Sequence, residues 1–255
     1  MLLDRRLLDR RTVAVLVATL VVIGLPTAVP ASAIVGGSTT SATTYPWLAA
    51  IGSPLFLTRA SGQFCAGALI GPDQVVTTAH CVELTRALPQ ALAVTFGRTD
   101  LRSHDGTTVR VKNIRINPDF EDTDFDGVTA HHNDVAILTL DRPQPGPFVE
   151  IDTPRGNVGT VLGWGATAEG DSSNTTLRAA VVPLVSDAVC ATVYGSAFDP
   201  HDMFCAGSTE ADTGEYDSGG PLLVDGHLTG LTSWAKGSAR PGFPGVYARL
   251  PQLDW

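Results

Sequence analysis

Short apolar runs separated by turn-forming residues dominate the chain. Stretches rich in Val, Ile, Leu and Phe alternate with Gly, Pro, Asn and Asp, which is typical of short strands joined by turns. The runs assigned to strands are 48–51, 74–76, 91–96, 109–114, 135–140, 159–162, 179–184, 221–224 and 228–234. No long stretch keeps the 3.6-residue period of a helix, and only residues 186–194 favour a short helix. The pattern therefore predicts an all-β protein, built as antiparallel barrels or as a sandwich.

The first 33 residues follow a different pattern and are predicted to be a signal peptide. Two arginine pairs precede an uncharged apolar run at 12–25, and Ala31-Ser32-Ala33 follows it. A basic region, a short hydrophobic core and a small-residue cleavage site are the parts of a secretory signal. The alternative is a membrane anchor, but a bilayer-spanning helix needs about 20 apolar residues, and this run is shorter. We therefore expect a secreted mature chain of residues 34–255 that does not remain on the membrane.

Charge narrows the range of partners. The segment 1–33 carries four basic and two acidic residues, so its removal changes the formal net charge from −9 to −11. An acidic chain argues against nucleic acid and anionic membranes, and it favours cationic substrates. The mature length suffices for one large domain or two lobes, and the Pro- and Gly-rich stretch 141–156 is the expected boundary between halves.

The chain has four cysteines, at 65, 81, 190 and 205. An even number in an exported chain indicates disulfides, and four cysteines allow three connectivities. Zinc binding is the competing use, but no Cys-x2-Cys spacing is present. Pairing of sequence neighbours closes two short loops, and we predict the disulfides Cys65–Cys81 and Cys190–Cys205, with no metal and no cofactor.

Three residues together suggest nucleophilic catalysis. His80 follows a strand-like run, Asp134 stands at the entrance of an apolar strand, and Ser218 lies in the turn sequence Asp-Ser-Gly-Gly-Pro. Separately they have structural interpretations: a histidine beside a cysteine, a strand-initiating aspartate and a surface turn. Together they supply base, orienting carboxylate and nucleophile in the chain order His, Asp, Ser, which is one of the few known orders of the catalytic triad.

Eight motifs in sequence order extend this picture over nearly all of residues 34–255. They are Ile34-Val35-Gly36-Gly37, Thr78-Ala79-His80-Cys81, Asp134-Val135-Ala136-Ile137-Leu138, Gly163-Trp164-Gly165, Met203-Phe204-Cys205-Ala206-Gly207, Asp217-Ser218-Gly219-Gly220-Pro221, Ser233-Trp234 and Pro244-Gly245-Val246-Tyr247. In these motifs and their spacing the chain resembles trypsin-like serine endopeptidases of the chymotrypsin family, in particular secreted bacterial ones.

The resemblance implies two antiparallel Greek-key six-stranded β-barrels, at about 34–145 and 146–255, with the active site in the cleft between them. It makes His80, Asp134 and Ser218 the catalytic residues, with the backbone N–H groups of Tyr216 and Ser218 as the oxyanion hole. We expect a monomer that hydrolyses protein or peptide substrates after Arg or Lys through an acyl-enzyme.

The resemblance also implies a substrate-binding set. Asp212 matches the aspartate at the floor of the specificity pocket, and a buried carboxylate there selects a cationic side chain. The other members of the set are Ser233, Trp234, Ala235 and Gly245.

The resemblance implies one further pair. The α-amine of Ile34, freed by cleavage after Ala33, is expected to pair with Asp217 and order the turn that carries Ser218.

Departures from the family pattern raise an alternative function. Tyr216 stands where the family has the glycine of the oxyanion hole, whose positive φ costs other residues on the order of 1–2 kcal/mol. A flipped peptide at Tyr216 would remove one donor, so we expect a slow protease, and the alternative is a weakly active or inactive protease-like binding protein. Gly214 and Ser238 replace a disulfide, and Ala235 replaces a pocket-wall glycine. Relatives continue into a C-terminal helix beyond the position of Trp255, and we expect its lack to lower stability.

Two surface segments near Asp134 are also informative. The start of a calcium-loop pattern at 122–127 lacks its closing glutamate, because position 133 is Asn, so we expect an acidic surface loop. His131 and His132 have no Cys or Glu at ligand spacing and are expected to be solvated loop residues.

Overall fold

The computed structural model describes residues 34–153, 155–250 and 253. The predicted signal peptide and the end of the chain after residue 253 lie outside the described residues. Among the described residues, no helix has both the length and the apolar character needed to cross a bilayer.

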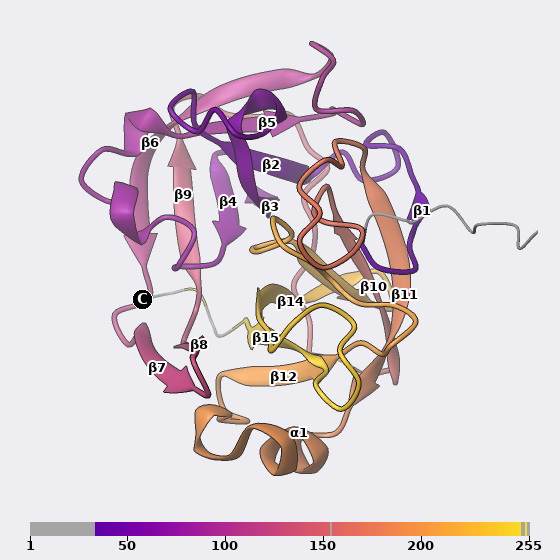
Figure 1. The fold of residues 1–255 in the computed structure, drawn as a ribbon. Helices are drawn as coiled ribbons and strands as arrows, with labels where there is room; N and C mark the ends of the chain where they lie inside the picture. Colours follow the sequence, from indigo (N-terminus) through magenta and orange to yellow (C-terminus); the bar gives the residue numbers. More distant parts are fainter. Residues whose placement is uncertain (1–33, 154, 251–252, 254–255) are drawn as a thin grey trace, which may run out of the picture. The chain divides into compact units, whose positions relative to one another are not determined.

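Six strands form a closed antiparallel barrel in the order β2-β3-β4-β9-β6-β5 (Figure 1). Its strands are β2 (Leu48–Gly52), β3 (Gln63–Gly71), β4 (Gln74–Thr77), β5 (Ala93–Phe96), β6 (Thr107–Ile116) and β9 (Ala136–Leu140). Alternation along the strands fills the interior with branched side chains, since Ile51, Val75, Val94 and Leu138 are fully buried. The neighbours β4 and β9 position two of the predicted catalytic residues, because both lie at the same end of this strand pair.

A second barrel has the order β11-β10-β13-β14-β15-β12 and closes through pairing of β12 with β11. Its strands are β10 (Val158–Gly163), β11 (Arg178–Val185), β12 (Met203–Ala206), β13 (Pro221–Val224), β14 (His227–Trp234) and β15 (Gly245–Arg249). The short β1 (Ser38–Thr39) pairs with β11, so this segment lies on the second barrel, although the sequence analysis grouped it with the first. The predicted fold class, two six-stranded antiparallel barrels, is confirmed.

All nine predicted strands are present, and α1 (Asp187–Tyr194) is the short helix expected at 186–194. Strands β3, β12 and β15 were not among the predicted runs. In β3 the sequence Gln-Phe-Cys-Ala-Gly-Ala-Leu-Ile-Gly has small residues where a strand pattern would have branched ones. Small residues are required there because a Cβ at Gly67 would lie 2.7 Å from the carbonyl oxygen of Val76 on the neighbouring strand.

The acidic segment that was expected to be a surface loop is a β-hairpin. Strand β7 (Glu121–Phe125) pairs with β8 (Val128–His132) through a turn at Asp126 and Gly127. The carboxylate of Asp126 forms an ion pair with Lys236. The expectation of a loop was wrong because cross-strand pairing, rather than an apolar pattern, stabilises this ribbon, whose strand β7 is mostly exposed.

Both predicted disulfides are present, Cys65–Cys81 and Cys190–Cys205. The first joins β3 to the turn after β4, and the second joins α1 to β12. The first disulfide therefore ties down the segment that carries His80.

Candidate active site

The pairing of β4 with β9 brings His80 next to Asp134. Thr77, the last residue of β4, lies opposite Ala136, the first residue of β9. His80 follows β4 by three residues and Asp134 precedes β9 by two, so both extend from the same edge. The Nδ1 of His80 lies 2.7 Å from Oδ2 of Asp134, and the backbone N–H of His80 donates to Oδ1 at 2.9 Å. The hydroxyl of Ser233, on β14 of the second barrel, donates to Oδ2 at 2.6 Å.

Burial and these hydrogen bonds oppose each other in setting the charges of the pair. Burial acts to raise the pKa of Asp134, but the positive charge and hydrogen bond of His80 outweigh it, so this pKa is lowered. Burial acts to lower the pKa of His80, but Asp134 and, more weakly, the charge of Asp122 raise it. Because the carboxylate accepts from Nδ1, a neutral His80 carries its proton on Nδ1 and has an unprotonated Nε2.

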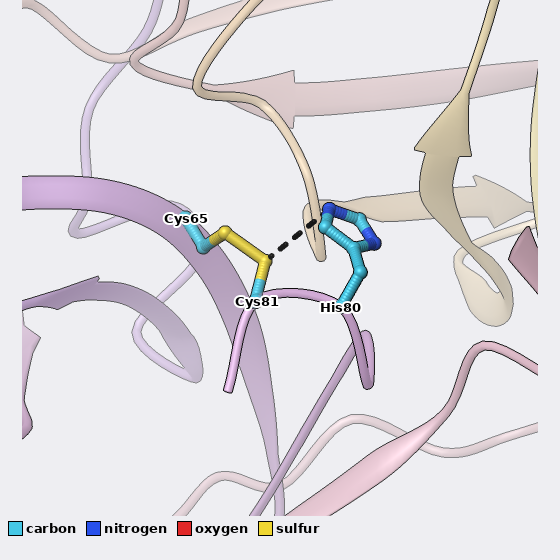
Figure 2. Close-up of side chains that lie close together, drawn as sticks. All are labelled: Cys65, His80 and Cys81. Atoms are coloured by element: carbon cyan, nitrogen blue, oxygen red, sulfur yellow. Dashed lines mark hydrogen bonds between the residues drawn. A yellow bond between two sulfur atoms is a disulfide. The ribbon is translucent and has the colours of Figure 1, made fainter. Parts of the chain in front are cut away.

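The position of Nε2 is visible in the close-up of His80 and the neighbouring disulfide (Figure 2). It lies 3.7 Å from the Sγ of Cys81, and among the described residues no hydrogen bond joins it to the hydroxyl of Ser218. Cys65, His80 and Cys81 bring three donor atoms close together. The two sulfurs are bonded to each other, and a metal binds thiolate rather than disulfide sulfur, so these residues do not form a metal site.

Ser218 belongs to a turn that both barrels hold in place. Its carbonyl oxygen accepts from the N–H of Ala66 on β3 at 2.8 Å, and the N–H of Gly219 donates to Thr232 on β14 at 2.8 Å. Gly219 has φ +74°, and a Cβ there would lie 2.3 Å from the Ala66 carbonyl oxygen. Only glycine fits this position, so backbone geometry requires the glycine that follows Ser218.

His131 is not a solvated loop residue, and that expectation was wrong. Its ring stacks on the ring of His80, with centroids 4.4 Å apart and planes at 11°. Its Nδ1 lies 2.7 Å from Oδ1 of Asp122, across the β7–β8 hairpin. His132 is buried, whereas His131 is partly buried, and Nδ1 of His132 lies 3.4 Å from Oδ2 of Asp202. The sequence shows the spacing of these histidines to Asp134 but gives no sign of the hairpin that turns them inward.

The charge of Asp122 gives the first prediction, on pH dependence. With His80 as the predicted general base, its raised pKa should place the acid limb of activity above the ordinary histidine value, because a general base must be neutral to accept a proton. Asp122→Asn removes one of the charges that raise this pKa, so the acid limb of kcat/KM should move to lower pH. Asp124→Asn, on the same strand, is the control, since Asp124 is not among the charges that act on His80. An acid limb that stays in place or moves to higher pH in Asp122→Asn would contradict this electrostatic role.

Tyr216 has φ +71°, the left-handed conformation for which the family position has glycine. The carbonyl of Glu215 accepts from the N–H of Ala166 at 2.8 Å. Since C=O and N–H of a trans peptide point in opposite directions, the N–H of Tyr216 points away from Ala166. The flipped peptide that the sequence suggested is therefore not the conformation in the structure.

A cavity of about 320 Å³ adjoins Ser218. Its lining includes Thr213, Ser233, Trp234 and Ala235, and also Gly214 and Ser238, the pair that replaces the family disulfide. A Cβ at Gly214 would lie 2.8 Å from the Ala166 carbonyl oxygen, so a cysteine there would be strained.

Asp212 lies beyond Thr213 and is almost fully buried rather than part of the cavity lining. Its carboxylate accepts from the N–H groups of Thr213 at 2.8 Å and Ala239 at 2.9 Å. Burial raises the pKa of Asp212 to about 7, against these two hydrogen bonds. Gly245 leaves room for the carboxylate, since a Cβ there would lie 2.8 Å from Oδ1. A cationic group that reached this carboxylate would stabilise its ionised form.

Asp217 is a second buried carboxylate, directly before Ser218. It accepts from the N–H groups of Gly165 at 2.8 Å and Gly214 at 3.0 Å. Burial raises its pKa to about 7, and the charge of Arg59 opposes the rise. Ile34 is fully buried in the second barrel with Val161 and Leu222. Ile34 is thus inside the protein, where any charged group would need a partner of opposite charge.

Two six-stranded antiparallel barrels, with a His–Asp pair supplied by the first and a serine turn by the second, are the arrangement of the chymotrypsin fold. By class the protein is a serine endopeptidase, a hydrolase of peptide bonds.

Comparison with known proteins gives the family. The family model described as Trypsin matches residues 34–255, and the chain belongs to this family. The chain is 38% identical to a trypsin of Saccharopolyspora erythraea over 229 residues, covering 85% of this chain and 93% of the relative. It is 36% identical over 205 residues to the vitellin-degrading protease of Bombyx mori, covering 75% and 74%. It is 35% identical over 214 residues to trypsin-1 of Astacus astacus, covering 76% and 87%.

Proposed function

We propose that the protein is a secreted trypsin-like endopeptidase that cleaves after Arg or Lys through an acyl-enzyme on Ser218. The observation that carries this proposal is the hydrogen-bonded His80–Asp134 pair, in which Asp134 is fully buried and is supported by Ser233 from the second barrel. The relatives named trypsin support the same reaction. Export is supported by the sequence of residues 1–33 and by the two disulfides, which are typical of oxidising compartments.

His80 takes the proton of Ser218 as the hydroxyl attacks the scissile carbonyl, and it then gives the proton to the leaving amine. In the structure Nε2 and the hydroxyl are not yet hydrogen-bonded, and such contacts tighten on substrate binding. Asp134 keeps the Nδ1 tautomer and stabilises the imidazolium. The N–H groups of Tyr216 and Ser218 donate to the oxyanion, whose charge develops only in the transition state.

The preference for Arg or Lys comes from Asp212 and from the residues that line the cavity next to Ser218. An Arg or Lys side chain enters along Trp234 and Ala235, and its cation ionises the Asp212 carboxyl. Ser233, Trp234 and Ala235 also pair with the substrate backbone as an extended strand. The substrates are proteins or peptides, and we expect the enzyme to act as a monomer without a cofactor.

Cleavage before Ile34 completes the site. The α-ammonium of Ile34 supplies the positive charge that the buried carboxylate of Asp217 needs, and the pair orders the turn that carries Ser218. Two facts support this: Asp217 has a raised pKa in the absence of such a charge, and Ile34 is already inside the second barrel.

The test is titration with an arginine-mimetic ester that acylates the nucleophile. A chain that begins at Ile34 should release one leaving group per molecule in a burst, and Ser218→Ala should release none. A chain that begins at Ala33 should give a much smaller burst, because its ammonium is displaced by one residue. Absence of a burst with every Arg and Lys ester, with binding retained, would establish the alternative, a protease-like binding protein. Equal turnover of Phe and Arg substrates would remove the Arg/Lys assignment.

A further inference from the structure

Arg59 is a buried arginine packed on the ring of Tyr216, the residue with the left-handed backbone. Its guanidinium carbon lies 4.1 Å from the centroid of the ring. Its N–H groups donate to four acceptors: the carbonyl oxygens of Ser172 (2.8 Å), Trp164 (2.8 Å) and Asn174 (2.9 Å), and Oε1 of Gln63 (3.1 Å). None of these acceptors is a carboxylate, so the ring face of Tyr216 supplies part of the stabilisation that a buried cation requires.

Gln63 links Arg59 to the backbone of Tyr216. An arginine can only donate hydrogen bonds, so the oxygen of the Gln63 amide faces Arg59 and its nitrogen faces the other way. That nitrogen donates to the carbonyl oxygens of Tyr216, at 2.9 Å, and of Cys65, at 3.1 Å. Gln63 is almost fully buried on β3, so its side chain has little freedom to leave this position.

Both peptide planes that flank Tyr216 are therefore held. Ala166 donates to the carbonyl of the plane before it, and Gln63 donates to the carbonyl of the plane after it. The ring is held separately, by the stack on Arg59. Two fixed planes determine φ and ψ of the residue between them, and a held side chain opposes the rotation that would relieve the strain of a positive φ.

We propose that Arg59 and Gln63 are positioning residues that hold Tyr216 in the left-handed conformation and thereby keep its N–H directed at the oxyanion. The contacts do for tyrosine what the absence of a Cβ does for glycine. The inference rests on the proposed function, because it assigns these residues to the oxyanion hole of that reaction. On this proposal the left-handed conformation of a non-glycine residue at position 216 depends on its aromatic ring.

Variants of Tyr216 separate the ring from the backbone. Tyr216→Phe keeps a ring for Arg59 to stack on, whereas Tyr216→Ala keeps the positive-φ strain and removes the stack. We expect kcat for an arginine ester to be about tenfold lower in Tyr216→Ala than in Tyr216→Phe, with KM values within about twofold, because the oxyanion forms only in the transition state. The kcat of Tyr216→Gly should exceed that of Tyr216→Ala, since glycine adopts a positive φ without contacts that hold it there. Equal kcat in the Phe and Ala variants would overturn the proposal.

Arg59 supplies a second, independent measurement. Arg59→Met should lower kcat about tenfold when residue 216 is Tyr, and the reduction should shrink to less than threefold in the Tyr216→Gly background. A purely structural loss would lower activity by the same factor in both backgrounds, and that result would also overturn the proposal. Arg102→Met, at an exposed arginine on the first barrel, controls for the loss of one positive charge and should leave kcat unchanged. If Arg59→Met does not fold, the Tyr216 series decides alone.

Structure determination gives a readout that does not depend on activity. In crystals of Tyr216→Ala the peptide between residues 215 and 216 should flip, and in Tyr216→Phe it should keep the orientation of the parent. If residue 216 stays left-handed in the Ala variant, the proposal that Arg59 and Gln63 hold this conformation through the Tyr216 ring is overturned, even if the parent protein is inert. If the parent is inert and only the Ala variant shows the flip, the proposed function is refuted. The positioning role of Arg59 and Gln63 is then supported.

Discussion

Replacement of Asp134 by Asn is expected to lower kcat by about 10⁴-fold, the effect known for loss of the correct histidine tautomer in this type of triad. The Asp134 carboxylate accepts hydrogen bonds from the backbone N–H of His80, from Nδ1 of its ring and from Ser233. An amide at this position can donate to Nδ1, which transfers the histidine proton to Nε2 and leaves no base for Ser218. Asn is nearly isosteric, so the packing should be retained.

Steady-state hydrolysis of an arginine ester at pH 8, together with a thermal unfolding curve, measures this prediction. Asp152→Asn, at a surface aspartate paired with Arg155, is the matched control and should keep the parental kcat. KM should change little, because the tautomer matters only for the chemical step. A folded Asp134→Asn protein whose kcat falls less than tenfold would show that Asp134 does not orient His80 during the reaction.

The affinity for a cationic ligand such as benzamidine is expected to rise about 100-fold between pH 5 and pH 8. In the free protein burial raises the pKa of Asp212 to about 7, so the carboxyl is largely protonated at pH 5. The amidinium binds the ionised form, and binding must therefore release a proton at acid pH. Below the pKa, affinity rises tenfold for each pH unit, and above it the affinity is constant.

Calorimetry in two buffers of different ionisation enthalpy measures both the affinity and the proton release. Near pH 5.5 close to one proton should be released per ligand, and none at pH 9. A flat affinity over pH 5–8 would refute a raised pKa at Asp212. Asp212→Asn should lose most of the affinity at pH 8, and Asp225→Asn, at an exposed turn residue, is the control.

The same pKa shift has a consequence for stability. A carboxyl with a raised folded-state pKa binds more protons in the folded than in the unfolded protein at pH values between the two pKa values. Its contribution is complete at pH below the unfolded value and is lost as pH rises to about 7. Asp212→Asn has no carboxyl at this position and therefore no such loss. The free energy of unfolding of the variant minus that of the parent should be larger at pH 8 than at pH 4.

The sequence alone determined much of the fold, because the responsible signals are local. Short apolar runs between turn residues located the nine predicted strands and α1. The motif order then placed His80 and Asp134 on the first predicted barrel and Ser218 on the second. The motifs that include Gly219 and Gly245 are visible in the sequence, and the structure gives the steric reason for glycine at both positions.

Strands without an apolar signature could not be predicted. Strand β3 is rich in small residues because neighbouring backbones approach closely there, and in the hairpin β7–β8 the strand β7 is polar and mostly exposed. The stack of His131 on His80 depends on that hairpin, so it was missed with it. Recognition of Glu121 to His132 as one paired ribbon would have been needed to find it.

The backbone conformation of Tyr216 could not be predicted from the sequence. Read locally, a tyrosine at a position that needs positive φ predicts a flipped peptide and a defective oxyanion hole. The structure instead has φ +71°, held by contacts with Arg59 and Gln63, and Gln63 lies 153 residues away along the chain. Local strain is a property of one residue and its neighbours, so the sequence determines it. The contacts that offset the strain form only when the two barrels are assembled, so only the tertiary structure could decide which conformation Tyr216 adopts.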